Sequence, residues 1–137
     1  MKIELSIITP EKELLKEQVD WVSLPTEAGV ITVLPHHIAL ITALVPGELE
    51  LHTGTTDRHL AIHGGFADID GTRVRVLADA AELAEEIDER RAQEAVERAQ
   101  KAKDAASGHE EQAAIIASLE RNLVRLHVAK RRRRQTR

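Results

Sequence analysis

The sequence predicts an α+β protein with two domains: a mainly β N-terminal sandwich or barrel, followed by an antiparallel hairpin of two helices. The first half alternates apolar and polar residues with a period of two, whereas alanines recur at steps of three and four from about Asp79 onward. Charge divides the same way. Residues 1–84 hold 6 basic and 13 acidic residues, a net of −7, and residues 85–137 hold 13 basic and 10 acidic, a net of +3. We therefore expect a β domain over residues 1–84 and a helical domain over residues 85–137.

Short strands separated by turn signals predict the β domain. Ile3, Leu5 and Ile7 alternate with polar residues, as in a half-buried strand. Two further apolar runs, 19–24 and 30–34, each end at a proline, and Asp70-Gly71 is a strong hairpin signal. The other predicted strand segments are 48–51, 60–62, 66–69 and 74–76. Strands this short and close together favour a sandwich or barrel over a parallel sheet with crossover helices.

The helical domain is predicted by a stretch without glycine or proline that ends at Ala106, and by a second apolar pattern over about Glu110 to Ala129. Two helix starts compete, at Asp79 and at Asp88, and Ser107-Gly108 separates the helices. The first helix offers almost only alanine for packing, so the hairpin buries little apolar surface alone. We expect this domain to rest on another surface and to be capable of movement.

Several function classes are excluded by composition and motif. The chain has no cysteine, no phosphate-binding G-x-x-x-x-G-K-[ST] loop and no apolar run near the ~20 residues that span a bilayer. Without a targeting segment at Met1, we expect an intracellular, soluble protein that reaches a membrane only through partners. His36 and His37 are adjacent and would point to opposite faces of a strand, and no other histidine has a recognisable ligand spacing. We therefore expect no metal site and no catalytic residue.

Three stretches carry a resemblance to a known family. They are Leu24-Pro25-Thr26-Glu27-Ala28-Gly29 with Val33-Leu34-Pro35-His36-His37, then Gly64-Gly65-Phe66-Ala67-Asp68-Ile69, and finally Ile87-Asp88-Glu89-Arg90-Arg91-Ala92. In this order the chain resembles the epsilon subunit of F-type, proton-translocating ATP synthases over essentially its whole length. It departs from the family's usual pattern at Val30 and Thr32, where acidic or polar residues and a second glycine are common, and at Ala39, where proline is common.

The resemblance implies a β sandwich of about ten strands and a two-helix C-terminal domain. It implies a non-catalytic subunit of the central rotor stalk, which couples proton flow to ATP synthesis and inhibits ATP hydrolysis through its mobile helical domain. The implied partners are the gamma subunit, the c-ring and the catalytic beta subunit, with no nucleic acid. The implied location is peripheral, on the cytoplasmic face of a bacterial plasma membrane or the stromal face of a thylakoid membrane. The implied c-ring and gamma contact loop contains Gly29, Val30, Ile31 and His37.

Arginines of the helical domain form the candidate ligand site. Arg91 and Arg98 share a face of the first helix, and Arg121 and Arg125 share a face of the second, so a hairpin would bring the four guanidinium groups toward a triphosphate. The alternative is that these four arginines are solvated surface residues without a ligand. The run from Ile87 to Ala92 is similar to the ATP-binding motif of epsilon subunits. That similarity implies ATP as a regulatory ligand, with no required cofactor, held by Glu82, Ile87, Asp88, Arg91, Ala92, Arg98, Arg121 and Arg125.

Two alternatives stay open at the level of sequence. One is a free nucleotide-sensing or RNA-binding module that uses the basic segment 130–137, although the near-absence of aromatic residues argues against single-stranded nucleic acid. The other is a rotor subunit whose helical domain is only structural. A terminal run of basic residues is also typical of a solvated chain end.

Overall fold

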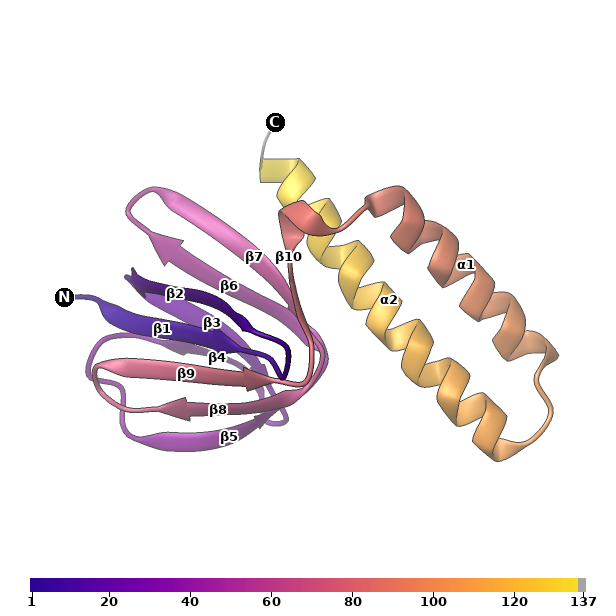
Figure 1. Cartoon of the computed structure of the whole chain (residues 1–137), viewed down its shortest axis with the longest axis horizontal. Coiled ribbons are helices and arrows are strands. Elements are labelled where there is room, and N and C mark those ends of the chain that lie inside the picture. The colour runs from indigo at the N-terminus through magenta and orange to yellow at the C-terminus, as the bar shows by residue number, and fades with distance from the viewer. Residues whose placement is uncertain (136–137) are drawn as a thin grey trace. The chain divides into compact units, whose positions relative to one another are not determined.

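The computed structural model describes residues 1–135 and divides into two compact units, Met1–Leu83 and a second unit from Ala84 onward. The predicted fold class is confirmed: ten strands precede two helices (Figure 1). The strands are β1 (Ile3–Ile8), β2 (Glu13–Val19), β3 (Trp21–Thr26), β4 (Gly29–Val33), β5 (Leu40–Leu44), β6 (Gly47–Thr53), β7 (Thr56–Ile62), β8 (Gly65–Ile69), β9 (Arg73–Ala78) and β10 (Ala81–Leu83). The helices are the 3₁₀ turn η1 (Ala84–Glu86), α1 (Glu89–Ala105) and α2 (His109–Gln135).

The β unit is one continuous hydrogen-bonded sheet that curls into a sandwich. Its strand order is β10-β7-β6-β3-β5-β8-β9-β1-β2, with β4 paired to β3. All pairs are antiparallel except β1 with β9, where Leu5 lies opposite Val74. Inward-facing aliphatic residues of these strands fill the core, because successive side chains of a strand point to opposite faces. Its fully buried large aliphatic members are Ile3, Leu5, Ile7, Val19, Val22, Leu24, Leu49, Leu51, Leu60, Ile62 and Ile69.

Gly65 is required where β8 begins. Its φ of +118° lies in a region that L side chains rarely adopt, and a Cβ there would overlap the carbonyl oxygen of Leu77 on the paired strand β9. Gly29, at the β3–β4 turn, has a similar φ of +112° but nothing within 4 Å of an added Cβ. The Gly64-Gly65 pair therefore serves strand packing and turn geometry.

Asp88 is the N-cap of α1, so of the two predicted helix starts the one at Asp88 is confirmed. The Asp88 side chain accepts a hydrogen bond from the backbone N–H of Arg91 (3.1 Å), the usual geometry of an N-cap. The other predicted start, Asp79, instead precedes strand β10. Helix α1 buries Ala92 and Val96, whereas α2 buries Leu119, Leu126, Val128 and Ala129. The apolar contribution of α1 is therefore the smaller one, as the alanine-rich sequence predicts.

Helix α2 is longer than predicted. It continues past Ala129 through the basic segment to Gln135, while Thr136 and Arg137 lie outside the described residues. Lys and Arg are good helix formers and their charges interact favourably with a helix C-terminus, so a basic run extends α2 without an apolar face. Arg133 also forms an ion pair with Glu89 of α1 (3.2 Å), which ties the end of α2 to the start of the antiparallel α1 (Figure 1).

Candidate functional site

The N-terminus of α1 positions two of the predicted ATP-binding residues. Asp88 caps the helix through the Arg91 amide, and its second oxygen lies 3.8 Å from the Arg91 guanidinium Nε. The Arg91 side chain is 84% exposed, so its guanidinium faces solvent and is accessible to an anion. The first turn of α1 therefore holds both the N-cap Asp88 and the exposed Arg91 guanidinium.

The other predicted arginines are distributed along the hairpin. The two helices run antiparallel, with the Glu89–Arg133 pair at the end away from the loop. Arg91 lies in the first turn of α1, Arg98 lies in the middle of α1, and Arg121 and Arg125 lie one turn apart in the middle of α2. Arg98 and Arg121 are exposed, and the partly buried Arg125 donates a hydrogen bond to Asn122 Oδ1 (3.4 Å). The exposed positions are compatible both with ligand contact and with solvated surface arginines.

The remaining predicted ligand residues have evident structural roles. Ile87 and Ala92 are 7% and 0% exposed, so their side chains contribute to packing. Glu82 lies on β10 of the β unit, where its carboxylate is 3.7 Å from His63, the residue that follows the neighbouring strand β7. The predicted ligand set is therefore drawn from both units of the chain.

The predicted contact loop surrounds the β3–β4 turn and the segment before β5. Val30 is 72% exposed, whereas its neighbour Ile31 packs partly against the core, as alternation along β4 requires. Gly29 forms the turn with positive φ, and the His37 ring is half-buried, with Nδ1 2.7 Å from the Ile38 carbonyl. Only part of this predicted loop thus has apolar side chains exposed to solvent.

A second apolar surface was not singled out from the sequence. Phe66 of β8 lies directly between Ala43 of β5 and Leu77 of β9, and Phe66 and Leu77 are 58% and 50% exposed. Ile41, two residues from Ala43 on the same face, is also exposed. We call these four residues the apolar face. The sequence offered one indication of this surface. Leu77 is apolar, although the alternation along β9 places it on the outer side, between the inward-facing Val76 and Ala78.

A polar cluster fixes the β6–β7 hairpin beside the start of β3. The backbone N–H of Gly54 donates to Asp20 (2.7 Å), which lowers the pKa of that carboxyl. His52 hydrogen-bonds through Nδ1 to Asp57 (2.5 Å), which raises the pKa of His52, and its ring stacks on Trp21 at 5.3 Å. These contacts stabilise a turn, and no predicted site residue belongs to them.

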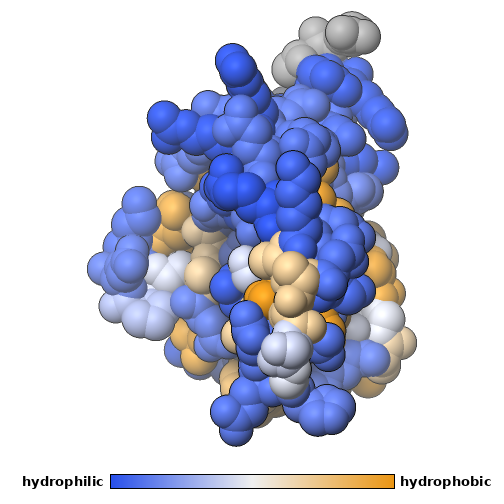
Figure 2. Space-filling view, turned by 90° about the vertical axis from the view of Figure 1, so that its right-hand side faces the viewer, coloured by the Kyte–Doolittle hydropathy of each residue, from blue (hydrophilic) through white to orange (hydrophobic). Residues whose placement is uncertain are grey.

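Hydrophilic residues predominate on the face of the molecule shown in Figure 2, with hydrophobic residues in smaller groups between them. Among the described residues, no helix is long and apolar enough to cross a membrane.

The architecture defines a class of two-domain proteins in which a β sandwich precedes a helical hairpin. Family models match both parts: the ATP synthase delta/epsilon chain β-sandwich domain over residues 2–84, and the long α-helix domain of the same chain over residues 85–130. The chain belongs to the ATP synthase delta/epsilon chain family, which confirms the resemblance stated above.

Relatives and solved structures agree with this membership. The ATP synthase epsilon chain of Herpetosiphon aurantiacus is 44% identical over 133 residues, covering 97% of this chain and 98% of the relative. That of Dehalococcoides mccartyi is 45% identical over 133 residues, covering 96% and 95%. A chain of the Euglena gracilis mitochondrial ATP synthase (OSCP/F1/c-ring) superposes with a TM-score of 0.79 at 26% identity, covering 87% of this chain and 76% of that one. A chain of the Tetrahymena thermophila ATP synthase central stalk and c-ring shares the fold, with a TM-score of 0.62 at 14% identity over 94% and 97%.

Proposed function

We propose that this chain is a non-catalytic subunit of the central stalk of a proton-translocating ATP synthase. The observation that carries the proposal is the match of both domains, over nearly their whole length, to ATP synthase epsilon chains. Its place is peripheral, on the cytoplasmic or stromal side of the coupling membrane, which it reaches only through the complex. Its role is to couple rotation driven by proton flow to ATP synthesis.

The β unit is the part that binds the rotor. Large exposed apolar patches rimmed by polar residues are a common feature of protein–protein contacts. The apolar face of β5, β8 and β9 fits the gamma subunit, and its edge is polar, with Arg75 paired to Asp68 at 3.0 Å. Val30 and the exposed residues Leu34 and Ile38 fit the c-ring, since they lie around the predicted contact loop.

Co-purification with gamma tests this assignment. A double substitution, Phe66→Glu with Leu77→Glu, places two charges on the apolar face at exposed positions, where the fold tolerates them. We expect it to abolish co-purification with gamma, while Thr55→Glu, an exposed residue of the β6–β7 turn, leaves it intact. Retention of gamma by the folded double variant contradicts the proposed contact.

The helical unit is the regulatory part. It inhibits ATP hydrolysis, with ATP as the ligand that biases its position and the catalytic beta subunit as its partner. Three features support this role: a small apolar interior, a basic segment that extends α2 to Gln135, and exposed arginines at Arg91, Arg98 and Arg121. A domain that buries so little apolar surface has a low free energy of local unfolding, and elements that move in regulation need such low local stability.

Titration of ATP into the isolated protein tests the ligand. We expect ATP binding that saturates at millimolar concentrations or below. Arg91→Ala and Arg121→Ala should each weaken the affinity for ATP at least tenfold. Arg90→Ala is the matched control, because Arg90 is the neighbouring exposed residue and pairs with Glu94 at 3.4 Å. Equal weakening by Arg90→Ala indicates a general loss of charge and removes the ATP site, while leaving the rotor role intact.

A further inference from the structure

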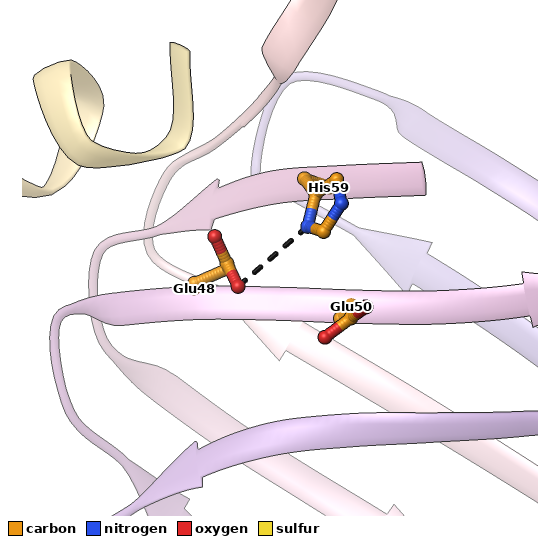
Figure 3. A group of neighbouring side chains, drawn as sticks. All are labelled: Glu48, Glu50 and His59. Carbon is orange, nitrogen blue, oxygen red and sulfur yellow. Dashed lines mark ion pairs between the residues drawn. The ribbon is translucent and has the colours of Figure 1, made fainter. Parts of the chain in front are cut away.

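Two strands of the β unit bring together three side chains that are separate in sequence. Glu48 and Glu50 lie two residues apart on β6 and share a face, and His59 of β7 lies directly opposite Glu50 (Figure 3). The intervening Leu49 and its partner Leu60 point into the core from the other face. The expectation of no metal site rested on the spacing of histidines along the chain, and that spacing carries no information about residues that face each other across two strands.

The geometry of the group suits a divalent transition-metal ion. One ligand atom from each of the three residues lies within 4.8 Å of the others. His59 Nδ1 is 3.6 Å from Glu48 Oε1. Two donors at about 2.0–2.2 Å from a tetrahedral ion lie about 3.3–3.6 Å apart, so this pair already has the separation of two zinc ligands. Rotation of the glutamate side chains would bring the wider separations, up to 4.8 Å, into the same range.

Burial and charge favour the same ligand. The His59 side chain is 1% exposed and points toward the Glu48 carboxylate, whose side chain is 16% exposed (Figure 3). Two neighbouring carboxylates attract a divalent cation more strongly than a single carboxylate does. One imidazole with two carboxylates selects Zn²⁺ or a similar first-row ion, whereas Mg²⁺ prefers oxygen ligands alone with octahedral geometry.

We infer that Glu48, Glu50 and His59 form a binding site for one divalent transition-metal ion of the Zn²⁺ class on the outer face of β6 and β7. Three protein ligands leave one position of a tetrahedral ion for water or another donor. The site rigidifies the β6–β7 pair, because it links neighbouring strands across the side opposite the core.

Titration of Zn²⁺ into the full-length chain, followed by calorimetry, tests the site. We expect one equivalent to bind with micromolar or better affinity, without competition from millimolar Mg²⁺. Glu50→Gln and His59→Gln are each expected to weaken binding at least tenfold. His109→Gln, at the exposed first residue of α2, is the matched control and leaves the affinity unchanged.

Circular dichroism establishes that each variant is folded. Glu50 is only partly buried, so Glu50→Gln keeps the test decisive where substitution of the buried His59 prevents folding. The absence of saturable Zn²⁺ binding in the parent chain overturns the inference. So does binding that persists at full affinity in Glu50→Gln, which shows that Glu50 is not a ligand, or binding that is lost only in His109→Gln, which assigns the ion to His109.

Discussion

Replacing Asp88 by alanine removes the N-cap of α1 and a carboxylate that lies 3.8 Å from the Arg91 guanidinium. In the structure the Asp88 side chain accepts from the Arg91 amide at 3.1 Å, and the Asp88 carbonyl accepts from the Ala92 amide at 2.9 Å. An N-cap aspartate contributes about 1 kcal/mol, and its charge at the helix N-terminus about 0.3–1 kcal/mol more. We therefore expect Asp88→Ala to destabilise the first turn of α1 by about 1–2 kcal/mol, a factor of about 5–30 in its opening equilibrium.

Amide hydrogen exchange measures this opening directly. In Asp88→Ala the amides of Arg91 and Ala92 should exchange about 5–30 times faster, while amides in the core of the β unit are unchanged. Asp104→Ala is the control, since Asp104 lies in the last turn of α1, where a negative charge opposes the helix dipole. Unchanged protection at Arg91 in Asp88→Ala, or equal loss in Asp104→Ala, would refute the assignment of Asp88 as the stabilising cap.

Three further predictions concern the β unit. Asp57→Asn should return the raised pKa of His52 toward 6.5, as followed by NMR titration; an unchanged pKa contradicts the proposed cause. Because the folded-state pKa of His52 is raised, its contribution to stability is present at acid pH and lost as pH rises through that pKa. His52→Gln should thus destabilise the protein more at about pH 5 than at about pH 9 in urea unfolding, and an equal loss at both counts against the linkage. Gly65→Ala should cost more than the ~1–3 kcal/mol of backbone strain alone, and more than Gly29→Ala, whose Cβ has open space; equal costs would show that contact with Leu77 is unimportant.

The strand core was predictable because its signal is local. Alternation along 73–78 places Val74 and Val76 inside and Arg73 and Arg75 outside, and the structure buries and exposes them accordingly. The change from strands to helices was visible for the same reason, since a switch from a period of two to steps of three and four needs no tertiary information. Asp88 and Asp79 carried equal cap signals, and only pairing of β10 with β7 decided between them.

Features that depend on pairing between distant strands could not be predicted. The parallel pairing of β1 with β9 joins Leu5 to Val74, and no local pattern specifies it. The apolar face and the Glu48–Glu50–His59 group likewise arise from register across neighbouring strands. The helical continuation of α2 beyond Ala129 was missed because a basic run lacks the apolar period on which helix prediction depends.

The central claim is that the β unit binds the rotor, while the helical unit inhibits ATP hydrolysis. The most direct test compares ATP hydrolysis by the reconstituted complex containing the full chain with hydrolysis by the complex containing a chain that lacks residues 88–137. We predict that the truncated chain still binds gamma and that the hydrolysis rate rises. An unchanged rate in a fully assembled complex would contradict the inhibitory role and leave the helical unit a structural one.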